Sequence, residues 1–421
     1  MGCTVKWVLS IKNMLLSKPN ITSEVQQLKA VIIHEPGNEV EKVTPSLAQH
    51  ALYDDILNLS IAQQEYKQFS DVLKQCSDVY TIRELFISTM KEENAREAFL
   101  LRYLGANIKS VDLQMLLNLN TETLFEQLVL GLEYRQTTLS NYLKHQQLAI
   151  NPLHNLFFTR DIGFTIFSKV FSGCMAKQVR KPEAALMHNV FNGIADFSTH
   201  LQLIDDGVCN ASIEGGDILV FNHETLIIGL SDRTSAEGID ALVTQLDDTS
   251  AKFIIVQELP HSGSFIHLDM VFTLLDSNIC MVYKPVIYDI KLQTLLLELN
   301  NGKVVNINEE ENILTALKKL KSELEPVFCG GDKNLYAERE QWHSGANFLA
   351  LAPGQVIGYE RNYHTNEALN DKGFEIIKAS DFLNRNMNLS QLGKCVITIE
   401  GSELARGGGG PRCMSLPVIR G

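Results

Sequence analysis

The chain has 421 residues, of which 45% are hydrophobic and 21% charged, as in ordinary globular proteins. A formal net charge of −13 without a basic block argues against a nucleic-acid or anionic-membrane partner and favours a cationic small substrate. No apolar run of about eighteen residues occurs, so no transmembrane helix is predicted. The eight cysteines include no C-x-x-C pair, which argues against a zinc site or a disulfide framework and predicts the reducing cytoplasm.

The first segments in chain order are a leader and a strand-containing unit. Residues 1–22 are expected to form a loose, disordered leader, because charges interrupt their apolar part and no signal-peptide cleavage site follows. Residues 28–83 then fit a strand, a long amphipathic helix and a second strand. Residues 88–148 differ, because their apolar residues recur at three and four and they hold no proline. We expect a helical subdomain there, inserted between two sheet units.

A plan of strand, strand, helix and strand is clearest in residues 218–260. Two apolar runs surround a polar turn, Ser231 or Asp232 can cap the helix that follows, and FIIVQEL forms the closing strand. The plan recurs clearly at 347–379 and more loosely at 155–204 and 265–335. Repeated units of this kind predict a closed, propeller-like array that leaves no exposed sheet edge.

Two motifs place charged residues beside buried strands. In NLFFTRDIG, Arg160 and Asp161 end an apolar strand, which also fits a simple salt bridge at a strand end. In SIEGGDILV, Glu214 and Asp217 flank two glycines that permit a tight turn, so a carboxylate can be aimed into a cavity. A plain β-bulge explains these glycines equally well.

Three further stretches bear side chains that could carry chemistry. His267 and Asp269 lie two apart in FIHLDMVF, so on a strand they face the same side, either as a buried core pair or as part of a site. Arg233 in GLSDRT stands near a helix start, where a surface position is the default interpretation. Cys413 follows the glycines of ARGGGGPRC, either as a reactive thiol on a loop or as a small apolar residue beginning a strand.

Together these residues supply a thiol, a histidine, several carboxylates and a few arginines. That inventory suits attack by a cysteine on a cationic carbon centre, with carboxylates binding the cation and histidine moving protons. A guanidinium group fits, because it is planar and pairs bidentately with carboxylates.

The chain resembles the arginine deiminases of the guanidino-group-modifying, or pentein, superfamily, from about residue 23 to its end. The stretches that carry the resemblance are IIHEPG, ALYDD, NLFFTRD, SIEGGDIL, GLSDRT, HLDMVFT, EREQWHSGANFLALAPGQVIGYERN and GPRCMSLP. The resemblance implies a five-bladed α/β propeller over residues 23–421, with the helical subdomain at 88–148 inserted. It also implies hydrolysis of L-arginine to L-citrulline and ammonia without metal or cofactor. We expect a cytoplasmic homo-oligomer that binds neither nucleic acid nor membrane.

The resemblance also implies which residues carry the reaction. Cys413 matches the nucleophile, His267 the general acid–base and Glu214 the carboxylate paired with that histidine. Asp161 and Asp269 match the two aspartates that bind the guanidinium group. The residues implied to contact the α-carboxylate end of the substrate are Asn155, Arg180 and Arg233, and those implied to line its channel are Leu52 and Phe158.

Two positions depart from the family pattern. Ile162 stands where many members have proline, which affects only a local turn. Gly408 stands where many members have an arginine, so residues 407–410 lack an anchoring side chain and are expected to be mobile without substrate.

Sibling activities remain alternatives, namely agmatine deiminase, dimethylarginine hydrolase and amidinotransferase. Arg180 and Arg233 favour a substrate that carries a carboxylate and therefore argue against agmatine. The alternative from another class is a non-catalytic propeller that serves as a binding scaffold.

Overall fold

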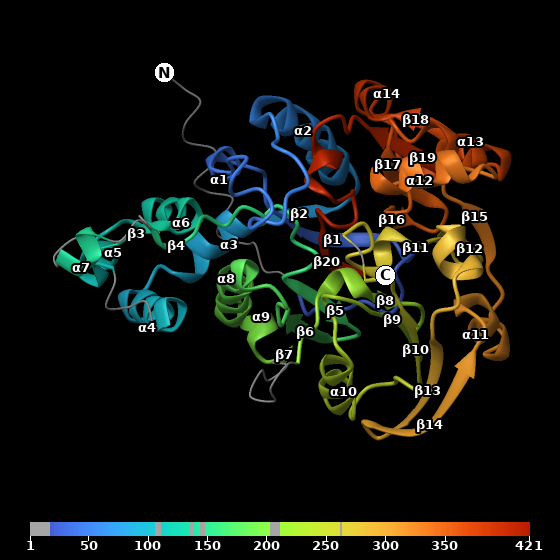
Figure 1. Cartoon of the computed structure of the whole chain (residues 1–421), viewed down its shortest axis with the longest axis horizontal. Coiled ribbons are helices and arrows are strands. Elements are labelled where there is room, and N and C mark those ends of the chain that lie inside the picture. Colours follow the sequence, from blue (N-terminus) through green and yellow to red (C-terminus); the bar gives the residue numbers. More distant parts are fainter. Residues whose placement is uncertain (1–16, 106–110, 135–138, 144–147, 203–210, 262) are drawn as a thin grey trace.

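The fold is α/β, with short strands grouped in separate mixed sheets and helices around them. The computed structural model describes residues 17–105, 111–134, 139–143, 148–202, 211–261 and 263–421. Figure 1 shows many of the strands near the middle and helices such as α2 (Leu59–Cys76), α10 (Ala236–Thr244) and α11 (Ile313–Lys319) at the periphery. Among the described residues there are six sheets, none of which closes on itself.

Five of the sheets share one plan, in which one strand pairs antiparallel with one neighbour and parallel with the other. Their strand orders are β2 (Asp78–Thr81), β1 (Leu28–Ile33), β20 (Leu416–Arg420); β5 (Gly163–Ile166), β6 (Lys169–Ser172), β7 (Leu201–Gln202); β8 (Ile218–Val220), β9 (Thr225–Leu230), β10 (Phe253–Glu258), β13 (Thr294–Asn300), β14 (Lys303–Glu310); β11 (Phe272–Asp276), β12 (Ile279–Val282), β15 (Glu325–Phe328); and β16 (Leu349–Ala352), β17 (Gln355–Tyr359), β19 (Cys395–Ile399), β18 (Glu375–Lys378). The repeated plan expected from the sequence is therefore confirmed at the level of single units.

Local sequence explains where the elements begin. Helix α2 follows the cap Asn58, whose side chain accepts a hydrogen bond from the Ile61 N–H, and it buries residues spaced three and four apart against the core. Helix α10 begins one residue after Ser235, whose hydroxyl accepts from the Gly238 N–H at 3.1 Å. The expected caps Ser231 and Asp232 were wrong, because Ser231 instead accepts from two backbone N–H groups of the turn before the helix.

Neighbouring sheets contact each other in chain order. Strand β20 contacts β5, and an isolated bridge joins Cys174, after β6, to Ile213, before β8. The 3-10 turns η4 (Gly215–Asp217) and η5 (Leu268–Met270) contact each other, β11 contacts β16, and β16 contacts β1. These contacts lead from the sheet of β1 through the other four sheets of the shared plan and back to it.

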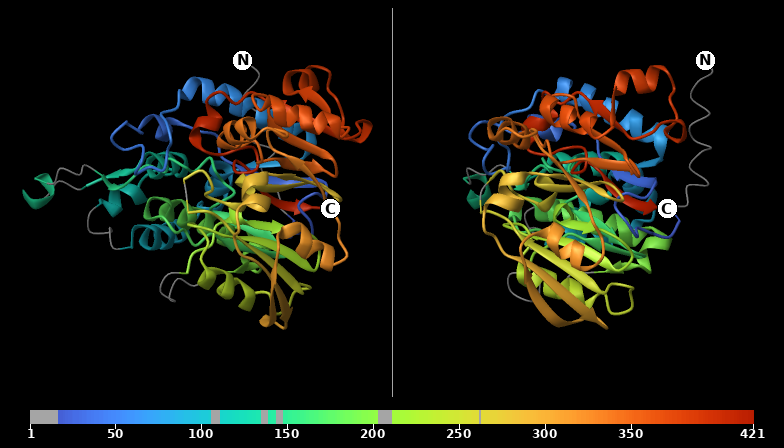
Figure 2. Two further views of the ribbon diagram at one scale, coloured as in Figure 1. Left: turned by 45° about the vertical axis from the view of Figure 1, so that its right-hand side comes forward. Right: turned by 90° about the vertical axis from the view of Figure 1, so that its right-hand side faces the viewer.

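The described part of 88–148 is mostly helical. It contains α4 (Glu93–Leu104), α5 (Leu113–Leu117), α6 (Thr121–Leu130) and α7 (Leu139–Tyr142). The short strands β3 (Leu132–Glu133) and β4 (Leu148–Ile150) pair as a sixth sheet. Figures 1 and 2 show that these elements project from one side of the strand-containing part.

The expected leader is only partly covered by the structure. Residues 1–16 lie outside the described residues. Asn20 forms a bridge with Ile419, and the buried Ile21 forms one with Phe167, so this segment joins strand β20 to the loop between β5 and β6. Within the described ranges, the length and apolarity of each helix fall short of what a membrane span requires.

Candidate active site

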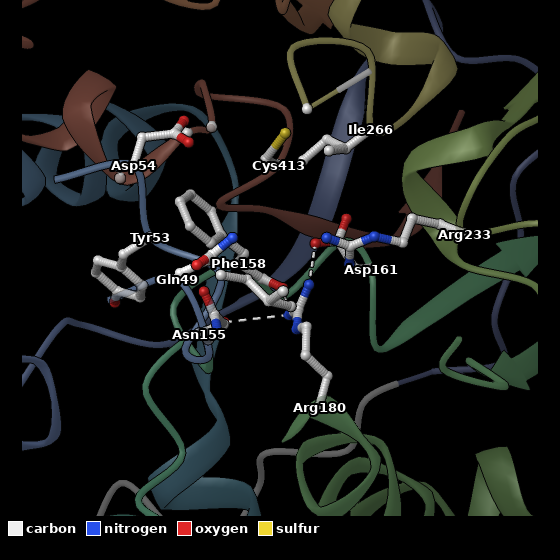
Figure 3. Close-up of a pocket in the computed structure, with 15 residues that line it drawn as sticks. Gln49, Tyr53, Asp54, Asn155, Phe158, Asp161, Arg180, Arg233, Ile266 and Cys413 are labelled. Carbon is white, nitrogen blue, oxygen red and sulfur yellow. Dashed lines mark hydrogen bonds and ion pairs between the residues drawn. The ribbon is translucent and has the colours of Figure 1, made fainter. Parts of the chain in front are cut away.

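A cavity of about 310 Å³ is lined in part by Asp161, two residues before β5, and Cys413, three residues before β20 (Figure 3). It is lined by Gln49, Leu52, Tyr53, Asp54, Asn155, Phe158, Asp161, Arg180, Arg233, Gly263, Ile266, Gly407, Gly408, Gly409 and Cys413. Seven of these are residues singled out in the sequence: Leu52, Asn155, Phe158, Asp161, Arg180, Arg233 and Cys413. The other three, Glu214, His267 and Asp269, are fully buried and contact residues of the lining.

His267 forms a buried hydrogen bond with Glu214. Its Nε2 atom lies 2.9 Å from Glu214 Oε2, and its Nδ1 atom lies 3.6 Å from Asp161 Oδ1. Burial opposes a charge on the imidazole, but Asp161, Glu214 and Asp217 outweigh it and raise the pKa of His267 to about 9. His267 directly precedes η5, so the expectation that it shares a strand face with Asp269 was wrong. The two residues nevertheless reach one site.

Glu214 is fitted closely between the histidine and an arginine. Its Oε1 atom accepts from the Ala176 N–H at 3.2 Å, and its Oε2 atom lies 3.5 Å from Arg233 Nη1. Burial favours its neutral form, yet His267 and Arg233 keep the pKa of Glu214 below its usual value. A Cβ at Gly216 would lie 2.5 Å from the His267 ring, so glycine here permits a close approach rather than a β-bulge.

Asp217 has a different task from Glu214. Its Oδ1 atom accepts from the Leu268 N–H at 2.8 Å, and its Oδ2 atom accepts from the Ser231 hydroxyl at 2.7 Å. Burial raises the pKa of Asp217 to about 6. Asp217 therefore fixes the backbone next to His267.

Cys413 lies three residues before β20, on the loop that follows the glycines. Its Sγ atom is 3.7 Å from Asp269 Oδ2 and 3.9 Å from Oδ1, and its carbonyl accepts from the Arg160 N–H at 3.0 Å. Burial, together with Asp269 and Asp161, raises the pKa of the Cys413 thiol well above its ordinary value. The side chain is only 3% exposed but reaches the cavity.

Each of the two aspartates is paired with one arginine. Arg180 Nη1 pairs with Asp161 Oδ2, and Arg412 Nη1 lies 2.8 Å from Asp269 Oδ2. Asp161 Oδ1 has no hydrogen-bond partner among the described residues. Asp161 thus uses one oxygen within the protein, which leaves its Oδ1 edge to a bound cation, whereas Asp269 Oδ1 also contacts Cys413 Sγ at 3.9 Å.

The two arginines of the cavity wall are engaged to different degrees. Arg180 contacts Asp161, Glu183 at 2.8 Å, and the carbonyls of Asn155 and Phe158 at 3.2 Å (Figure 3). Arg233, in the part of the chain described, has one recorded side-chain ion pair, the 3.5 Å contact with Glu214. More of the Arg233 N–H groups therefore remain for an anion in the cavity.

Several site residues were not found from the sequence. Asp54 lines the cavity, and burial raises the pKa of its carboxyl. Asn347 contacts the Cys413 sulfur and Arg412 contacts Asp269, although neither residue lines the cavity. Both lie within stretches quoted for the family resemblance, but a single sequence gives no sign of what they touch.

One group in the site could hold a metal ion by distance alone. Ligand atoms of Asp161, Glu214 and His267 all lie within 4.8 Å of one another. His267 Nε2 is already hydrogen-bonded to Glu214, however, and the free Oδ1 edge of Asp161 suits a planar organic cation.

The chain is similar to several known proteins. A family model described as arginine deiminase matches residues 50–420. Arginine deiminase of Bacillus cereus (strain B4264) is 31% identical over 95% of this chain and 98% of its own length, and that of Streptococcus agalactiae serotype Ia is 32% identical over the same shares.

Solved structures resemble the fold at low sequence identity. Unliganded AgrE has a TM-score of 0.53 and 12% identity, covering 94% of this chain and 40% of AgrE. The N-terminal domain of ArgZ, covalently bound to a reaction intermediate, has a TM-score of 0.52 and 13% identity, covering 93% and 98%. A mutant dimethylarginine dimethylaminohydrolase from Pseudomonas aeruginosa complexed with citrulline has a TM-score of 0.51 and 13% identity, covering 93% and 99%. The family model and the curated relatives show that the chain belongs to the arginine deiminase family.

Proposed function

We propose that the protein hydrolyses L-arginine to L-citrulline and ammonia through a covalent amidino-cysteine intermediate on Cys413. The observation that carries the proposal is the position of the Cys413 sulfur, 3.7 Å from Asp269 and in one cavity with Asp161. A guanidinium group held between these carboxylates presents its carbon to the sulfur. No cofactor or metal takes part in the proposed reaction.

Substrate binding would itself activate the thiol. In the free protein, burial and the two aspartates raise the pKa of Cys413, so the thiol holds its proton. A guanidinium cation neutralises the field of Asp161 and Asp269, which lowers that pKa and releases the proton to solvent. The thiolate then attacks the guanidinium carbon, and a neutral tetrahedral adduct forms.

His267 moves the remaining protons. Because the pKa of His267 is raised to about 9, the imidazole is charged at neutral pH. Glu214 occupies Nε2, so Nδ1 is the atom that protonates the departing nitrogen, and ammonia leaves a cationic thiouronium. Neutral His267 then takes a proton from water, whose oxygen attacks the same carbon. Collapse of the second adduct releases the thiolate and citrulline, and the extra proton passes to the ammonia.

The far end of the substrate would be recognised by the arginines. Arg233 has N–H groups that can donate to the α-carboxylate. Arg180 instead donates to protein groups and serves mainly to fix Asp161 and Asn155. Leu52 and Phe158 line the channel beside them. A free carboxylate-binding arginine favours arginine over agmatine.

We also infer that the five similar sheets surround one axis as blades of a propeller over residues 23–421, with the helical elements of 88–148 inserted. The ring of contacts between neighbouring sheets supports this arrangement. So does the placement of the site, because Asp161, Glu214, Asp269 and Cys413 each come two to four residues before the edge strand of a different sheet. We further propose that the protein is a homo-oligomer and that it is located in the cytoplasm.

The decisive experiment is to incubate the purified protein separately with L-arginine, agmatine and dimethylarginine and to measure citrulline and ammonia. Release of both from arginine, with much slower turnover of the other two compounds, is the expected result. Preferred turnover of agmatine or dimethylarginine would assign a sibling activity. Absence of turnover with all three compounds would favour a binding scaffold.

A further inference from the structure

Asn347 makes the nearest recorded polar contact to the Cys413 sulfur within the described residues. Its Nδ2 atom lies 3.1 Å from Sγ, closer than the carboxylate oxygens of Asp269 at 3.7 and 3.9 Å. The side chain is 1% exposed and lies two residues before β16. None of the roles proposed above uses this residue.

The backbone around Asn347 determines which way its amide points. Oδ1 accepts from the N–H groups of Arg412 at 2.9 Å and Cys413 at 3.2 Å, and a backbone N–H can only donate. Nδ2 lies 3.2 Å from the Asp269 carbonyl oxygen, which can only accept. In a flipped amide, the NH₂ group would face the two backbone N–H groups, and Oδ1 would face the Asp269 carbonyl oxygen. The NH₂ group therefore faces the sulfur.

Gly410 allows Asn347 to pack this closely. A Cβ at Gly410 would lie 2.6 Å from Asn347 Oδ1 and 2.8 Å from its Cβ, so any side chain there would push the amide away from the loop. Asn347 therefore packs against Gly410 and bonds to the backbone N–H groups of Arg412 and Cys413. This contact fixes the backbone at Cys413.

The sulfur needs a hydrogen-bond donor in this place. Asp269 and Asp161 both disfavour a thiolate, and burial does so as well. An N–H group that is already in position stabilises the anion when it forms, without reorganisation. Asn347 also comes from the remaining sheet unit, the one that contributes neither an acid, a histidine nor the thiol.

We propose that Asn347 is a positioning residue that donates a hydrogen bond to Cys413 Sγ, stabilises its thiolate and fixes the sulfur beneath the guanidinium carbon. The proposal rests on the nucleophilic role proposed for Cys413. With it, each of the five sheet units supplies a polar side chain to the site just before its edge strand.

The test is the pH dependence of Cys413 alkylation by iodoacetamide, measured by mass spectrometry of the Cys413 peptide. Asn347→Asp keeps the oxygen that accepts both backbone N–H groups and loses the donor, and Asn347→Ala loses the donor without adding a charge. We expect alkylation at least about tenfold slower at each pH in both variants, because losing a hydrogen bond to an anion shifts the thiol pKa upward by about one unit or more. The kcat/KM for arginine should fall by about 10- to 100-fold.

Asn366→Asp provides a matched control. Asn366 is also a buried asparagine, and it donates to the carbonyl oxygens of Tyr359 at 3.1 Å and Glu360 at 3.5 Å, outside the cavity lining. Its replacement should leave the alkylation profile unchanged. Wild-type alkylation rates in folded Asn347→Asp and Asn347→Ala would overturn the proposal. Failure of the nucleophilic role gives a different pattern, in which Cys413→Ala retains activity while alkylation still depends on Asn347.

Discussion

The imidazole of His267 and the carboxylate of Asp161 face each other without a hydrogen bond. Nδ1 lies 3.6 Å from Oδ1, and neither atom has a hydrogen-bond partner among the described residues. Buried polar atoms without partners are costly, so a ligand that bonds to them would stabilise this arrangement. A guanidinium N–H placed there would donate to Asp161 Oδ1. In the proposed reaction it would also hold the departing nitrogen beside His267 Nδ1.

The first prediction concerns pH. Activity that needs charged His267 should fall as pH rises through about 9, and Glu214→Gln should move this alkaline limb to lower pH, because Glu214 helps to hold the proton. His267 keeps its proton in the native state, whereas in the unfolded chain it loses the proton near pH 6.5. Its contribution to the free energy of unfolding is therefore fully present below about pH 6.5 and is lost as pH approaches 9. Rate profiles and denaturant unfolding across this range provide the measurements. An alkaline limb that Glu214→Gln leaves in place would contradict the pairing.

The second prediction concerns the nucleophile. Cys413→Ala should fold and lose turnover by several orders of magnitude, because no other described thiol lines the cavity. Intact-mass spectrometry of a quenched wild-type reaction should show an arginine-derived adduct on Cys413. The buried Cys280, which burial makes unreactive, is the control, and Cys280→Ala should keep its activity. Full activity in Cys413→Ala would remove the covalent mechanism.

The third prediction separates the two aspartates. Asp161→Asn and Asp269→Asn should each lower kcat/KM by about 100-fold or more, since breaking a buried charge pair costs about 3 kcal/mol or more. Asp269→Asn should also lower the pKa of the Cys413 thiol in the free protein, because Asp269 is the first of the carboxylates that raise it. Faster alkylation of Cys413 in that variant, despite slower turnover, is the expected signature. Values of kcat/KM within tenfold of wild type in both variants would show that neither carboxylate binds the guanidinium.

The fourth prediction concerns the substrate's carboxylate. Arg233→Ala should raise KM for arginine and narrow the preference over agmatine, because the two compounds differ only in that group. Arg180→Ala should instead damage kcat and folding together, since Arg180 binds Asp161 and Glu183. Steady-state kinetics with both substrates separates these outcomes. Equal losses of kcat/KM for arginine and agmatine in Arg233→Ala would show that Arg233 does not bind the substrate carboxylate.

The fifth prediction concerns a buried charge outside the cavity. Glu24 lies 3.1 Å from Arg412 and 3.9 Å from Arg160, and these arginines outweigh burial and lower the pKa of Glu24 to about 2. Glu24→Gln should reduce the free energy of unfolding by about 3–5 kcal/mol, because buried guanidinium groups lose their counter-charge. The contribution is present above pH 4.5 and is lost as pH falls toward 2. Urea unfolding measures it, and the exposed Glu97→Gln should have no comparable effect.

Much of the architecture could be predicted from local sequence. The plan of residues 347–379 is found as expected, with β16 and β17 joined at Pro353-Gly354, where Gly354 has a φ of +72°, and β18 after the helix α13 (Tyr363–Asp371). These features depend on apolar runs, turn residues and helix periodicity, all of which are local. The segment of His267 was misjudged because a short apolar run does not reveal whether the chain forms a strand or a 3-10 turn.

The glycine loop shows what local reasoning could not reach. The sequence suggested that residues 407–410 lack an anchor, yet Tyr359 donates a hydrogen bond to the Gly409 carbonyl at 3.0 Å, and Arg406 pairs with Glu403 and Asp55. Glu403 is a local partner, but Tyr359 and Asp55 lie far away in the chain, as do the partners of Asn347 and Arg412. Mobility of the loop remains a prediction for hydrogen exchange, with and without an unreactive substrate analogue.

Strand β1 pairs with both β2 and β20, so its sheet joins residues 28–33 to residues 416–420. A sheet whose strands are this distant in sequence forms slowly, because loop closure precedes its contacts. Strand β1 can pair with β2 locally, but its antiparallel pairing with β20 requires the segment that carries Cys413. The position of Cys413, three residues before β20, therefore depends on a pairing between the first and last strands of the described fold.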